Sequence, residues 1–138
     1  MEKKESEKKL GVWMDHAQAY FIKYYENGNR TRVKTINNPH HGDARGHRQG
    51  EKMEHNKEQQ DQKAYFKSLT NEMMTYDEIL LFGPTDAKVE LLNKLREDPH
   101  FDQKEIHVQQ ADKMTDNQQQ AFVFDFFSPN KKTNEGEQ

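Results

Sequence analysis

The side chains best suited to chemistry are histidines, and one polar segment, residues 37–63, holds four of the seven. These four are His40, His41, His47 and His55. An imidazole nitrogen can bind zinc, and it can take up a proton near neutral pH. Strong zinc signatures hold their ligands at fixed spacing on a rigid element, however, and this glycine-containing segment offers none. We therefore expect no bound metal and no cofactor, and we expect these histidines to be solvated residues that add pH-dependent charge.

Carboxylates offer a second kind of chemistry, that of a metal-dependent nuclease. Asp15 stands at the end of the first predicted strand, and a nuclease centred on it would need further acids to hold two Mg²⁺ ions about 4 Å apart. The partner acids that the chain offers are Glu72, Asp86, Asp112 and Asp116. No acid directly follows Phe82, because Gly83-Pro84 occupies that place. The simpler interpretation makes Asp15 a turn residue and Asp116 a first-turn helix residue whose charge favours the helix dipole.

The composition indicates one small core with polar appendages. The chain has 138 residues, of which 31% are hydrophobic and 33% charged, with a net charge of -3. Leu, Ile, Val and Phe number 24 together, and none lies in residues 1–9, 37–63 or 128–138. Segments without such residues cannot form a core. We therefore expect a disordered N-terminal tail over 1–9, a single domain over 10–127 with a long polar loop over 37–63, and a disordered C-terminal tail over 128–138.

Several classes of protein are excluded by the same composition. The chain has no cysteine, so disulfides, thiol catalysis and thiolate metal sites are excluded. No apolar run approaches the roughly 20 residues that span a bilayer, and no apolar stretch follows the charged N-terminus as in a secretory signal. A pI near 6.2 opposes general DNA binding but permits a local basic patch. We expect a cytoplasmic protein that contacts neither membrane nor DNA.

The hydrophobic periodicity predicts the elements that must position these side chains. Alternation and β-branched or aromatic content predict strands over 10–15, 19–25 and 32–36, joined by tight turns. The rest of the chain predicts a helix after residue 64, a buried strand over 79–82 and a helix after Thr85. A fifth strand follows, with alternating Ile106 and Val108, and then a helix opened by the capping box Thr115-x-x-Gln118. The C-terminal part of the 37–63 segment, from about Lys52, could instead be solvated helix. The order β-β-β-α-β-α-β-α predicts a ribonuclease H-like three-layer α/β sandwich with a five-stranded mixed sheet.

Four stretches of the sequence resemble a known family when they are taken in order. They are GVWMDHAQAYFI, the Gly/His/Arg-rich HHGDARGHRQGEKMEHN, ILLFGPTDAKVELL, and HFDQKEIHV followed by Ala111-Asp112. Together they resemble the middle domain of the class-one release factors of archaea and eukaryotes. They are also similar to the matching domain of Pelota-type ribosome rescue proteins and to small bacterial translational-machinery-component proteins. The resemblance covers about residues 10–127 and implies the same ribonuclease H-like fold.

The resemblance also implies a role for the polar segment. In release factors the corresponding loop carries Gly-Gly-Gln, which enters the peptidyl transferase centre and helps water to attack the peptidyl-tRNA ester. Here Gln49 is present, but His47 and Arg48 replace the glycines. The resemblance therefore implies a ribosome- or tRNA-binding module of rescue, hibernation or stress type without intact release-factor catalysis. Its insertion element would be residues 38–57, with RNA contacts from Arg45, His47, Arg48, Gln49, Lys52 and Lys57.

Three other functions remain open from the sequence. One is a peptidyl-tRNA esterase that uses Gln49 as its catalytic residue. Another is the metal-dependent ribonuclease H-like nuclease centred on Asp15. The last is a domain that has kept the fold and binds another protein through its surface.

Overall fold

The protein is represented by a computed structural model that describes residues 7–39 and 51–129, the side chains of residues 51–56 excepted. Its centre is a five-stranded sheet in the order β3-β2-β1-β4-β5. The first three strands, β1 (Lys9–Met14), β2 (Gln18–Tyr24) and β3 (Arg30–Asn37), form an antiparallel meander. The strands β4 (Glu78–Gly83) and β5 (Glu105–Gln110) continue the sheet parallel to β1. The predicted mixed sheet is confirmed.

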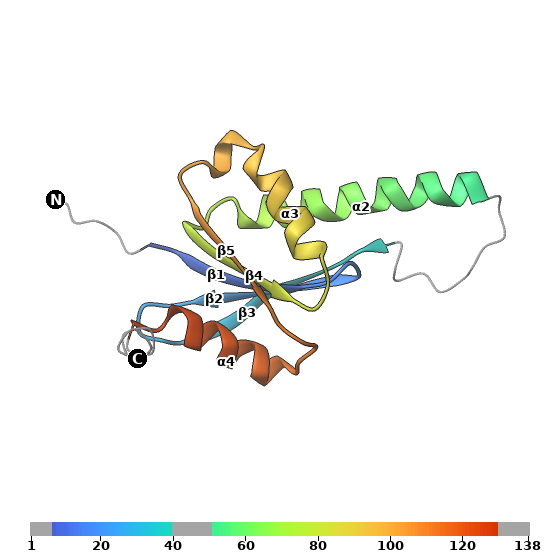
Figure 1. Cartoon of the computed structure of the whole chain (residues 1–138). Coiled ribbons are helices and arrows are strands. Elements are labelled where there is room, and N and C mark those ends of the chain that lie inside the picture. Colours follow the sequence, from blue (N-terminus) through green and yellow to red (C-terminus); the bar gives the residue numbers. More distant parts are fainter. Residues whose placement is uncertain (1–6, 40–50, 130–138) are drawn as a thin grey trace.

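Helices cover both faces of this sheet (Figure 1). One face is covered by α2 (Glu51–Met73) and α3 (Ala87–Arg96), and the other by α4 (Asp116–Phe127). A short 3₁₀ helix, η1 (Pro99–Phe101), leads from α3 into β5. The order β-β-β-α-β-α-β-α and the three-layer α/β architecture are therefore those predicted from the sequence. No helix in the described ranges is long and apolar enough to cross a membrane.

Two hydrophobic clusters, one on each face of the sheet, hold the helices against it. The alternation along β1 sends Leu10, Val12 and Met14 toward α2 and α3 and sends Trp13 toward α4. The central strand β4 is buried along its whole length, as its continuous apolar run predicts. Gly11 has no side chain, and this allows α4 to approach the sheet: a Cβ there would lie 2.4 Å from Val123 Cγ2. The core therefore depends on close packing at the middle of β1 as well as on burial.

The helix starts agree with the sequence in one case and differ slightly in another. At α4 the capping box is complete, because Thr115 Oγ1 accepts a hydrogen bond from Gln118 N at 3.2 Å and the Gln118 side chain accepts one from Thr115 N at 2.9 Å. At α3 the N-cap position belongs to Asp86, while the Thr85 hydroxyl accepts a hydrogen bond from Ala87 N at 3.2 Å. Thr85 therefore still accepts a hydrogen bond from a first-turn amide, although it stands one residue before the N-cap.

The prediction of a polar loop over 37–63 needs correction over its second half. Residues from Glu51 onward belong to α2, a helix of 23 residues, as the alternative of a solvated helix from about Lys52 allowed. Residues 51–73 contain no Gly or Pro and are rich in Glu, Lys and Gln, which are strong helix formers. Hydrophobic periodicity could not reveal residues 51–63 as helix, because they have no apolar face. The connection from β3 to α2 is thus residues 38–50.

Candidate nucleic-acid interface

The N-terminal half of α2 extends beyond the sheet (Figure 1). Among the helix side chains that the structure describes, those of residues 57–60 are exposed, and the first buried ones are Tyr65 and Phe66, followed by Leu69 and Met73. We call residues 51–60 the α2 extension. At 1.5 Å per residue, the α2 extension is about 15 Å long. The described side chains of the α2 extension, those of residues 57–60, therefore have no part in the core.

The direction of the α2 extension is fixed by polar contacts at its base. The buried Tyr65 hydroxyl donates a hydrogen bond to the carbonyl oxygen of Asp15 at 2.9 Å. Burial, and next the nearby charge of Asp15, hold the pKa of Tyr65 well above its usual value, so that this hydroxyl remains a neutral donor. Asn38, also buried, donates from Nδ2 to His16 O at 3.0 Å and to Gln62 Oε1 at 3.3 Å. The helix is thereby bound both to the end of β1 and to the residue that follows β3.

The segment predicted to bind RNA is attached to this part of the fold. Strand β3 ends and α2 begins on the same side of the molecule (Figure 1). Four of the predicted RNA-binding residues, Arg45, His47, Arg48 and Gln49, lie in the segment between them, outside the described residues. Lys52 lies on the α2 extension, but its side chain is outside the described part as well. The structure thus places the two ends of the segment, while the roles of its side chains stay a prediction.

Lys57 is the predicted RNA-binding residue whose side chain is described. It is 68% exposed on the α2 extension, with Nζ 3.6 Å from Asp61 Oδ2, one helical turn away. The Asp61 side chain is only 15% exposed, whereas that of Lys57 lies at the surface, where an incoming phosphate can reach it. Residues 38–57 contain four basic residues, three acidic residues and four histidines. Their net charge is +1 with neutral histidines and rises as the imidazoles take up protons.

The acids of the nuclease hypothesis are not gathered into a site. Asp15 Oδ1 accepts hydrogen bonds from Ala17 N at 2.8 Å and Gln18 N at 2.9 Å, which is the arrangement of a turn residue. Glu72 forms an ion pair with Lys34 at 3.9 Å. Asp116 forms one with Arg32 at 2.8 Å. Neither these acids nor Asp86 and Asp112 belong to a cluster of three potential metal ligands in the described part of the chain. The simpler interpretation of Asp15 is therefore the one that the structure supports.

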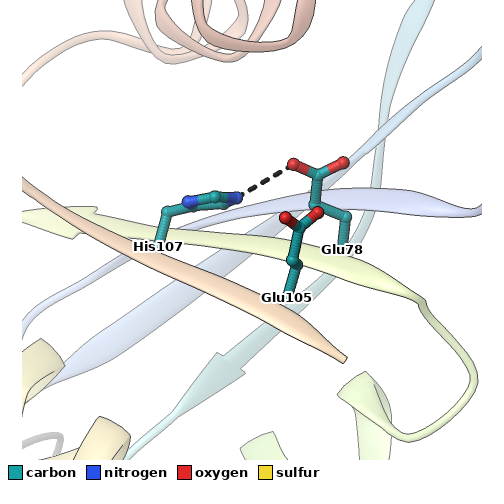
Figure 2. Close-up of side chains that lie close together, drawn as sticks. All are labelled: Glu78, Glu105 and His107. Carbon is teal, nitrogen blue, oxygen red and sulfur yellow. Dashed lines mark hydrogen bonds and ion pairs between the residues drawn. The ribbon is translucent and has the colours of Figure 1, made fainter. Parts of the chain in front are cut away.

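A different group of potential ligands was not foreseen from the sequence. Glu78, Glu105 and His107 offer atoms that all lie within 4.8 Å of one another (Figure 2). Two of them stand two residues apart on β5, and the third opens the neighbouring strand β4. The sequence signal was the Glu-x-His of residues 105–107, which alternation places on one face of a strand. Recognising the third member requires the register between β4 and β5, which the sequence does not reveal.

Comparison with solved structures finds Pelota proteins from archaea. The Pelota protein of Thermoplasma acidophilum matches with a TM-score of 0.59 and 15% identity, over 91% of this chain and 34% of that one. The Pelota protein of Archaeoglobus fulgidus matches with a TM-score of 0.57 and 11% identity, over 96% of this chain and 37% of that one. No protein-family model and no curated protein matches the chain.

These matches concern one part of a larger protein. The chain spans about a third of the length of each Pelota protein, and identities of 15% and 11% are evidence for the fold alone. The resemblance to Pelota that the sequence predicted is confirmed at this level. The chain therefore has the α/β fold of about one third of an archaeal Pelota protein.

Proposed function

We propose that this protein is a translation-associated module that binds the ribosome, or a tRNA-like RNA surface, through residues 38–57. The observation that carries this proposal is the α2 extension on a Pelota-like fold. A helix that extends beyond the sheet and whose described side chains there are exposed is suited to contacts with another molecule. The polar, histidine-rich segment that it carries has the side chains for such contacts with RNA.

The chemistry of binding would be mainly electrostatic. Arg45, Arg48, Lys52 and Lys57 would contact phosphates, and the four histidines of the segment would add positive charge when protonated. His47 and Gln49 can donate or accept hydrogen bonds at bases or ribose hydroxyls. In this proposal the protein acts in the cytoplasm, where ribosomes are, and its role is of the rescue, hibernation or stress type.

We further propose that binding occurs without hydrolysis of peptidyl-tRNA. Gln49 is preceded by His47 and Arg48 rather than by two glycines. A backbone that must approach RNA closely and adopt unusual dihedral angles depends on glycine, because every other residue adds a Cβ. The side chains at positions 47 and 48 would therefore hinder the approach that the release-factor tip makes.

The proposal is tested by sedimentation of the intact protein with purified ribosomes. At low salt we expect the protein to pellet with ribosomes, because four phosphate contacts give binding with a steep salt dependence. The slope of log K against log salt is expected to lie between about -3 and -4 for four contacts. A protein that stays in the supernatant at low salt, or that pellets equally at low and high salt, would show the proposal to be wrong.

A further inference from the structure

The sheet face that α4 covers has three metal-ligating side chains close together (Figure 2). Glu78 and Glu105 are direct partners in the parallel pairing of β4 with β5, and His107 follows Glu105 on the same face. His107 Nε2 lies 2.9 Å from Glu78 Oε2. The His107 ring also lies 4.9 Å from the ring of Phe126 on α4, which restricts its orientation. The backbones of the three residues are thus held by adjacent strands, and the His107 ring is held in addition by a packed helix.

The charges of this cluster are not balanced. Glu78 is only 8% exposed, and its Oε1 lies 3.5 Å from Lys9 Nζ. Among the described side chains, Glu105 has no ion pair of its own. Like charges directly opposite each other on neighbouring strands destabilise a sheet. Lys9 pairs with Glu78 and, at 3.8 Å, with Glu7, so a cation between Glu78 and Glu105 would reduce the repulsion that remains between them.

The ligand types and distances suit one class of cation. Zinc and related divalent transition metals accept imidazole nitrogen together with carboxylate oxygen, whereas Mg²⁺ and Ca²⁺ prefer oxygen alone. Two ligand atoms of a tetrahedral zinc ion lie roughly 3.4 Å apart. The 2.9 Å between His107 and Glu78 is close to that value, and the exposed Glu105 side chain is free to adjust. We propose that Glu78, Glu105 and His107 bind a divalent transition-metal ion of the zinc class, in place of the hydrogen bond between Glu78 and His107.

The ion would have a structural consequence at the edge of the sheet. It would link β5, which is an edge strand, to the more central β4 beneath the end of α4. Three protein ligands leave at least one coordination position for water or another ligand. This site is separate from residues 38–57 and does not depend on the proposed binding of RNA.

Zinc binding is best measured in a protein without the other clustered histidines. His40, His41, His47 and His55 could bind zinc by themselves, so all four are changed to Asn to give a background variant. Calorimetric titration of this variant with Zn²⁺ is expected to show one equivalent bound, and the melting temperature is expected to rise with zinc. A large excess of Mg²⁺ is expected to leave this binding unchanged.

Two further changes in that background separate a metal site from a simple hydrogen-bonded pair. Glu105→Gln is expected to weaken zinc binding by about tenfold or more, yet to raise the melting temperature without metal, because it removes the repulsion with Glu78. His107→Asn is expected to weaken zinc binding similarly. The matched control is His16→Asn, since His16 Nε2 also lies 3.1 Å from one carboxylate, that of Glu90, but belongs to no group of three ligands among the described residues. This control is expected to bind zinc as the background does.

The proposal is overturned if the background variant binds no zinc, if Glu105→Gln binds zinc as tightly as the background, or if Mg²⁺ displaces zinc. Because Glu105 is exposed, its replacement by glutamine is expected to leave the fold intact. Failure of His107→Asn to fold would therefore leave the Glu105→Gln result to decide the question. An equal weakening of zinc binding in His16→Asn would also contradict the assignment.

Discussion

Replacing Gly83 with alanine is expected to lower the free energy of unfolding by about 3 kcal/mol. Gly83 ends β4 directly beside the end of β1, and a Cβ at this position would lie 2.0 Å from the carbonyl oxygen of Met14. The obstacle is backbone in the central pair of parallel strands, so no side-chain rotation can relieve it. Urea denaturation followed by circular dichroism measures the effect as a shift of the midpoint.

A second glycine in the same sheet provides the matched control. At Gly11 a Cβ would lie 2.4 Å from Val123 Cγ2, which belongs to a side chain on α4. Gly11→Ala is therefore also expected to destabilise the protein, but Val123→Ala in the same chain should restore part of the stability. No such second change should rescue Gly83→Ala. A Gly83→Ala protein with the midpoint of the parent would show that β1 and β4 are not as close as described.

Neutralising the four basic side chains in segment 38–57 is expected to lower the affinity for ribosomes by a factor on the order of 100 at low salt. The variant carries Arg45→Gln, Arg48→Gln, Lys52→Gln and Lys57→Gln. The salt slope falls by about one for each phosphate interaction that is removed, so the remaining binding should depend little on salt. Because the Lys57 side chain is 68% exposed and the other three residues belong to a polar segment, we expect little change in stability. Sedimentation across a salt series measures both effects.

The control for this variant removes the same charge elsewhere. Lys67, Lys94, Arg96 and Lys113 are exposed and lie outside residues 38–57. Changing all four to glutamine alters the net charge by the same amount, so it separates a local interaction from a general electrostatic attraction. This control is expected to reduce the affinity much less. An equal reduction in the two variants would contradict the assignment of the interface to residues 38–57.

The fold could be predicted from the sequence because most of its signals are local. The alternation through Leu10, Val12 and Met14, the apolar run at the start of β4 and the capping box at Thr115 each depend on residues within a few positions of one another. The α2 extension could not be predicted in this way, since hydrophobic periodicity gives no signal where a helix has no apolar face. Helix propensity and the absence of Gly and Pro from residues 51–73 were the remaining signals.

The functional groups were harder to predict for a different reason. Asp15 was a candidate metal ligand because it follows a strand, but its carboxylate accepts hydrogen bonds from the backbone of its own turn. The cluster of Glu78, Glu105 and His107 was missed because it forms only through the register of two parallel strands 27 positions apart in the chain. A crossover connection leaves that register free in the sequence, whereas a two-residue hairpin fixes it. The register between strands, rather than the composition, thus determines which potential ligand side chains lie close together.

Photo-crosslinking tests most directly whether residues 38–57 contact ribosomal RNA. A benzoylphenylalanine placed at position 48 lies in the proposed interface, and one placed at position 94 lies on α3, outside residues 38–57. The proposal predicts crosslinks to ribosomal RNA from position 48 and none above background from position 94, with both proteins pelleting with ribosomes at low salt. Crosslinks to RNA from position 94 but not from position 48 would contradict the proposed function.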